Sequence, residues 1–206
     1  MEVSLTEFVD FATTKTISAQ VTKAKEIFAS RPYDPRTDFW KTMRDRLQDL
    51  ELGKRLLNSV CAGLSDPKKM NRYPQAVLGY EKFRKRTAAK WFRSPSWNWS
   101  FEDLTVRVKP DAGYEIDGKQ FVVKWYFREA TLTALRRKIT FALFAAAMPP
   151  EISLTPAILD VAAGKLHPAA IPIDGMHFEL HAAARSFAQI WNDLEIGNSA
   201  KRATGV

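Results

Sequence analysis

Two carboxylates and a lysine lie within a short stretch of the chain, where they could act together on a phosphate. Asp111 and Glu115 carry the oxygen ligands that Mg²⁺, a hard cation, prefers. Lys124 carries an ammonium group that can position a phosphate or a water molecule. Glu81 is the only acid in residues 67–101, so it is the only carboxylate that this preceding segment can add. These residue types indicate metal-assisted phosphodiester chemistry, provided that the fold brings them together.

The elements that would position these residues are predicted by alternation and by turn chemistry. Three runs alternate apolar with polar residues, as β-strands do: 104–109, 112–116 and 121–127. Between the last two, Asp117-Gly118 predicts a two-residue hairpin turn, because glycine tolerates the positive φ that such turns require. The hairpin would aim Asp111 and Lys124 at the same spot.

Helices are predicted on both sides of these strands. Residues 1–62 carry apolar side chains at steps of three and four and form an N-terminal helical region. Three further helices and a short buried strand are expected in the rest of the chain, at 73–92, from the N-cap Thr131 to Pro149, at 157–161 (the strand) and at 178–194. The predicted fold class is α/β (α+β), a mixed central sheet of about four strands flanked by helices. Residues 196–206 are expected to form a flexible tail.

The order helix, three strands, helix, strand resembles the core of the PD-(D/E)XK nuclease superfamily over about residues 73–165. Such enzymes place an aspartate near the start of the second strand and a (D/E)-x-K triplet on the third. Here Pro110-Asp111 and Val122-Val123-Lys124 stand in these places. The resemblance implies a restriction-endonuclease-like core within residues 73–195, to which the N-terminal helical region is an extension.

The same resemblance implies a set of site residues. Asp111 and Lys124 are its candidate catalytic residues, with Glu81 from the first helix and Glu115 as a displaced carboxylate. Asp111 and Glu115 are the candidate metal ligands. The sequence departs from the family pattern at Val122, where a carboxylate is expected. An isopropyl group removes a ligand and a negative charge together, so the site is predicted to be degenerate and without a cofactor, with Mg²⁺ expected only if activity is retained.

The net charge of +8 comes almost entirely from one segment. Residues 61–100 hold nine Lys and Arg against two acids, which localises the excess. Six of these bases form the candidate nucleic-acid-binding set: Lys82, Arg84, Lys85, Arg86, Lys90 and Arg93. Aromatic residues, from Phe83 to Phe101, are interleaved with them. Bases beside aromatics can hold a phosphate backbone and stack on unpaired nucleobases, although the charges can equally form a solvated helix face over an aromatic core.

The preferred interpretation is a nucleic-acid-binding protein with an inactive nuclease-like core, with DNA and RNA both open. One alternative is a scaffold subunit that binds an acidic protein partner through the same patch. Another is an active Mg²⁺-dependent nuclease with a displaced carboxylate. A single cysteine, Cys61, and an N-terminus without a basic, apolar leader predict a cytoplasmic location. The longest apolar run, residues 141–148, is far shorter than the roughly 20 residues of a membrane span, and oligomeric state is left open.

Overall fold

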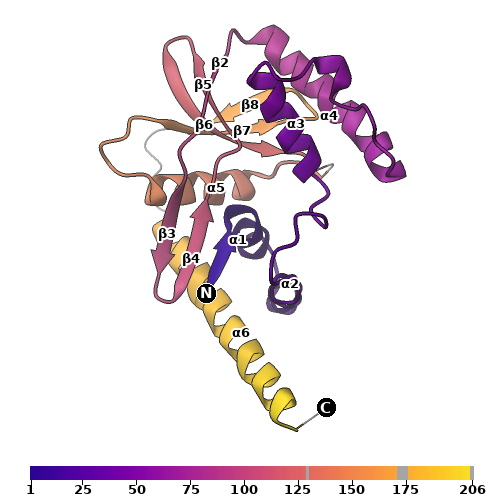
Figure 1. Ribbon diagram of the computed structural model, residues 1–206. Coiled ribbons are helices and arrows are strands. Elements are labelled where there is room, and N and C mark those ends of the chain that lie inside the picture. Colours follow the sequence, from indigo (N-terminus) through magenta and orange to yellow (C-terminus); the bar gives the residue numbers. More distant parts are fainter. Residues whose placement is uncertain (129, 171–175, 205–206) are drawn as a thin grey trace.

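The structure, a computed structural model, describes the backbone of residues 1–128, 130–170 and 176–204 (Figure 1). Its elements in chain order are β1 (Glu2–Ser4), α1 (Leu5–Ala12), α2 (Ile17–Ala29), α3 (Lys41–Glu51), the 3₁₀ turn η1 (Leu57–Ser59), α4 (Pro67–Arg86), β2 (Lys90–Phe92), β3 (Trp97–Phe101), β4 (Leu104–Val108), β5 (Ala112–Ile116), β6 (Lys119–Tyr126), α5 (Ala134–Ala147), β7 (Thr155–Asp160), β8 (Lys165–Pro168) and α6 (His177–Thr204). The strands form two sheets of different size.

The larger sheet has five strands in the order β2-β5-β6-β7-β8. β5 pairs antiparallel with β2 and with β6, and β8 pairs antiparallel with β7. β6 and β7 are parallel, because α5 crosses over between them and returns the chain to the same end of the sheet. The predicted class, a mixed sheet flanked by helices, is therefore confirmed.

Helices cover both faces of this sheet. α3 and α4 bury Met43, Leu47 and Phe83 against one face, together with Tyr114 of β5. α5 covers the other face, where Phe141 packs with strand residues. The approach of α4 is very close at one point. A Cβ at Gly79 would lie 1.9 Å from the carbonyl oxygen of Val161, so the contact requires glycine.

The smaller sheet has the order β1-β4-β3 and belongs to a second apolar cluster. Phe8 and Phe11 of α1 pack there against Phe187 of α6 and Trp99 of β3. The cluster also takes in α2 and part of α5. The C-terminal part of α6 extends away from the remainder of the molecule (Figure 1).

The predicted three-strand meander is wrong at its first connection. Residues 104–108 do form a strand, but β4 pairs with β3 and β1 and not with β5. The first neighbour of β5 is instead β2, which lies in a segment predicted as the end of a helix. α4 ends at Arg86, and its C-cap residue Thr87 has an extended backbone conformation. The alternation of Trp97, Trp99 and Phe101 is a period-two signal for β3 that the prediction did not use.

Three other expectations about helices and strands are corrected. Residues 1–62 contain a strand, β1, besides helices. The N-cap of α5 is Thr133, whose hydroxyl accepts a hydrogen bond from the Arg136 N–H, and not Thr131. Residues 196–204, expected to be a tail, continue α6. Residues 205–206 of that predicted tail lie outside the described residues.

Candidate functional site

Asp111 and Lys124 face each other across the β5–β6 hairpin. Asp117 and Gly118 both have positive φ, as the predicted two-residue turn requires, and this turn fixes the register. Counting outward from it, Ala112 pairs with Val123, so Asp111 lies opposite Lys124. The Lys124 ammonium is 2.9 Å from Asp111 Oδ2. The predicted convergence of these two side chains is therefore confirmed, while a catalytic role for them stays a prediction.

The Asp111 carboxylate is largely enclosed, with 8% of the side chain exposed against 20% for Lys124. Its Oδ2 atom also accepts a hydrogen bond of 2.9 Å from the Trp125 backbone N–H. The Asp111 N–H donates a hydrogen bond of 2.9 Å to the Val123 carbonyl. This bond continues the β5–β6 ladder beyond the end of β5. These contacts give Asp111 a structural role in the hairpin whatever its chemistry.

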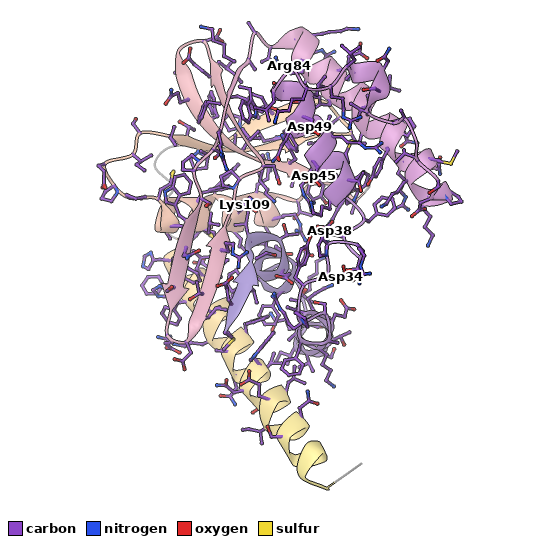
Figure 2. All side chains as sticks on the ribbon, viewed as in Figure 1. Asp34, Asp38, Asp45, Asp49, Arg84 and Lys109 are labelled. Atoms are coloured by element: carbon purple, nitrogen blue, oxygen red, sulfur yellow. The ribbon has the colours of Figure 1, made fainter. Side chains whose placement is uncertain are left out.

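α3 adds residues to this site that the sequence did not predict. Arg44 Nε lies 3.8 Å from Asp111 Oδ1, and the Gln48 amide donates a hydrogen bond of 2.8 Å to the Asp111 carbonyl. The two residues are four apart on α3 and so share a helix face. Arg44 is also paired with Asp38. Figure 2 shows Asp34 and Asp38 in the segment leading into α3, with Asp45 and Asp49 along the helix.

Val122 is fully buried at the position where the family pattern has a metal-binding carboxylate. It lies two residues before Lys124 on the same strand face and belongs to the apolar cluster that contains Ile139 and Leu143 of α5. Opposite it in register is Gly113. The valine is thus part of the packing between sheet and helix.

Glu81 and Glu115 do not join Asp111. Glu81 pairs within α4 with Lys85 at 2.7 Å, and Glu115 pairs with Lys90 of β2 at 3.5 Å. Along β5, the four-residue step from Asp111 to Glu115 corresponds to about 13 Å. Within the part of the chain that the structure describes, no three His, Cys, Asp or Glu side chains come close enough together to hold a metal ion. Of the four candidate catalytic residues, only Asp111 and Lys124 are brought together.

A second polar cluster lies on the opposite face of the sheet, under α4. The hydroxyls of Tyr80 and Tyr114 are 2.7 Å apart, and the Tyr80 hydroxyl donates to the Glu51 carboxylate. Glu51 is also 3.4 Å from Arg84 Nε. Burial, followed by the charge of Glu51, raises the pKa of Tyr114, and burial with its two neighbours raises that of Tyr80. Both tyrosines therefore stay neutral well beyond neutral pH and act as hydrogen-bonding groups.

The six predicted nucleic-acid-binding cations divide into paired and unpaired groups. Arg84 is half-buried and donates to the Ala89 carbonyl at 2.5 Å besides approaching Glu51. Lys85 and Lys90 have the carboxylate partners already described. The remaining three are exposed and form no ion pair with any residue that the structure describes: Lys82, Arg86 and Arg93.

The interleaved aromatic residues serve mainly the two cores. Phe83 is buried against Tyr80 and Tyr114, and Trp91 packs against the same cluster. Trp99 is buried in the other cluster, where it stacks with Phe101. Their positions favour a packing role over the stacking on nucleobases that the sequence left open.

Comparison with known proteins adds no assignment to this geometry. Neither the family models nor the curated proteins that were compared with the chain match it. None of the described helices is long and apolar enough to span a bilayer. Function is therefore inferred from the residues themselves.

Proposed function

We propose that the chain binds nucleic acid through the cations at the C-terminal end of α4 and around β2, and that its core is a PD-(D/E)XK nuclease-like core whose metal site is degenerate. The observation that carries the proposal is the exposure of Lys82, Arg86 and Arg93 without an ion pair among the described residues. Such cations bind a phosphate backbone favourably, because binding releases the counterions condensed on it.

The order of elements supports the nuclease-like part of the proposal. α4, β2, β5, β6, α5 and β7 follow one another as helix, three strands, helix and strand, and β3 and β4 form an insertion between the first two strands. The aspartate just before β5 and the lysine of β6 meet at 2.9 Å, in the places that the resemblance assigns to an aspartate and a lysine.

The arrangement of the carboxylates favours binding over cleavage. Val122 supplies no ligand, and both Glu81 and Glu115 are paired elsewhere. Asp111 is left as a single carboxylate that is already neutralised by Lys124. A hard divalent cation needs several oxygen ligands, so these side chains offer a weak site for it.

The proposal is tested by fluorescence anisotropy with labelled single-stranded DNA, duplex DNA and RNA. We expect binding that weakens steeply between about 50 and 200 mM salt, as counterion release requires. The variant K82A/R86A/R93A should lower the slope of log K against log salt on duplex DNA by about 0.9 for each phosphate that the variant no longer neutralises.

The matched control is K15A/K25A/K54A, which removes the same charge from three exposed lysines without a described ion pair elsewhere on the surface. It should leave the salt slope nearly unchanged. The absence of salt-dependent binding to any of the three nucleic acids would contradict the proposal. So would an equal loss of affinity in both triple variants, because binding would then reflect net charge alone.

A further inference from the structure

A cleft of about 400 Å³ opens between the end of α3 with η1 and the last turns of α4. Leu50 and Leu57 form its apolar wall, and the ion pairs Arg84–Glu51 and Lys85–Glu81 line the rest of it. Figure 2 marks Arg84 at this part of α4. The volume is in the range of pockets that receive a small ligand or a large side chain.

Two exposed leucines stand close in the sequence to residues that line this cleft. Leu56 precedes the lining residue Leu57 and is 72% exposed. Leu78 is 65% exposed and lies one helical turn before Glu81, which also lines the cleft. Two large apolar side chains beside an apolar-walled cleft are typical of a surface that another molecule covers.

The surface becomes cationic directly beyond Leu78. Lys82 and Arg86 follow it along α4 at four-residue steps, so neighbouring residues of this series lie side by side on the helix. Both are exposed, and neither forms an ion pair with a described residue. The complementary surface is therefore one that combines an apolar side chain with negative charge.

We propose that this cleft is a docking site for an acidic segment of a partner protein. The segment inserts one large apolar side chain between Leu50 and Leu57 and pairs its carboxylates with Lys82 and Arg86. Nucleic acid alone does not account for the surface, because phosphates contact cations and leave Leu56 and Leu78 exposed to water. Since Lys82 and Arg86 also belong to the proposed nucleic-acid surface, the acidic segment competes with nucleic acid.

The proposal is tested with a displayed library of random peptides. Peptides that bind L56S/L78S are removed, and peptides that bind the whole unaltered chain are then kept. We expect the selected peptides to carry acidic residues around one large apolar residue. A synthetic peptide of this kind should bind L56S/L78S about tenfold more weakly than the unaltered chain, because two apolar contacts beside the inserted side chain are removed. K82A/R86A should weaken binding several-fold at low salt. Its difference in affinity from the unaltered chain should shrink as salt is added, because salt screens the charge pairs.

The control is I17S, which alters a leucine-sized side chain on α2 that is 79% exposed. It should leave peptide affinity unchanged. Selected peptides without an excess of acids, or with affinity indifferent to L56S/L78S, would overturn the proposal. Self-association in sedimentation experiments that L56S/L78S abolishes would overturn it too, because a second copy would then be the occupant. L56S/L78S should retain nucleic-acid binding, which separates failure here from failure of the proposed function.

Discussion

The Asp111–Lys124 pair and the C-terminal end of α4 both carry charged side chains, but the fold pairs the charges of the first region and leaves cations of the second unpaired. In the first region the charges are enclosed and matched, since one carboxylate accepts from an ammonium and a backbone N–H and is approached by Arg44. In the second, Lys82 and Arg86 are exposed and have no carboxylate partner among the described residues. A charged residue therefore indicates an external partner only when the fold leaves its charge unmatched.

The energetics of the two regions differ for the same reason. Charges removed from water are costly unless they are paired, so losing one partner of an enclosed pair is strongly destabilising. An exposed ion pair contributes only about 0–1 kcal/mol, because water and salt screen it. Substitutions at the first region should therefore change stability, whereas those at the second should change binding.

The largest effect is expected for D111A. The substitution leaves Lys124 half-enclosed without its carboxylate and the Trp125 N–H without its acceptor. We expect a loss of about 3–5 kcal/mol in the free energy of unfolding, measured by urea denaturation.

The matched control for D111A is E115A. Glu115 also lies on β5 and also faces a lysine, but that lysine, Lys90, is mostly exposed. We expect a change of about 0–1 kcal/mol in the same measurement. Equal effects of D111A and E115A would erase the distinction between the two regions.

A smaller loss is expected for V122E. The new carboxylate would lie in the apolar cluster with Ile139 and Leu143, with Lys124 two residues away to compensate in part. We expect a loss of about 3 kcal/mol in the free energy of unfolding. Q120E, on the same strand face but exposed, should change it by no more than about 0.5 kcal/mol.

Adding Mg²⁺ to V122E sharpens this test. If the core is nuclease-like, the new carboxylate and Asp111 provide two ligands, and Mg²⁺ should recover part of the lost stability through preferential binding to the folded state. Q120E should show no such recovery. Failure of Mg²⁺ to stabilise V122E would count against the nuclease-like interpretation of the hairpin.

Controls aside, the smallest effect is expected at the polar cluster beneath α4. Y114F removes a buried hydroxyl that lies 2.7 Å from the Tyr80 hydroxyl, and should cost about 1–2 kcal/mol at neutral pH. Because the pKa of Tyr114 is raised in the folded chain from the ordinary value of 10.0, the unfolded chain loses this proton first. The stability that this shift contributes is present below pH 10 and is lost as the pH rises above it, by up to about 1.4 kcal/mol per pH unit.

The readout is the free energy of unfolding at several pH values on either side of pH 10. The unaltered chain should lose stability more steeply than Y114F above that pH, because Y114F lacks one of the titrating groups. Parallel curves for the two proteins would show that Tyr114 is not held neutral by its burial.

Much of the hairpin could be predicted from local sequence. Asp117-Gly118 specifies a turn, and a two-residue turn leaves a single register for the strands that it joins. Asp111 and Lys124 must then lie opposite each other on one face, whatever surrounds them. The mixed class of the sheet could also be predicted, because a helix that crosses over between two strands of one sheet makes those strands parallel.

The neighbours of that hairpin could not be predicted. β4 has strong alternation, yet alternation does not say which strand is its partner, and it pairs in the smaller sheet. Arg44 and Gln48 reach Asp111 from a helix more than sixty residues earlier in the chain. Nothing in the spacing of these residues signals that contact, because it depends on how α3 packs on the sheet.

The sequence by itself determined the turn, the alternation of the strands and the excess of positive charge in residues 61–100. These are local properties, set by backbone conformations and by residue types. Only the tertiary structure decided which charges are matched, because an ion pair depends on distances between side chains that the chain brings together from separate elements. That is why Asp111 and Arg84 have internal partners while Lys82 and Arg86 remain available to another molecule.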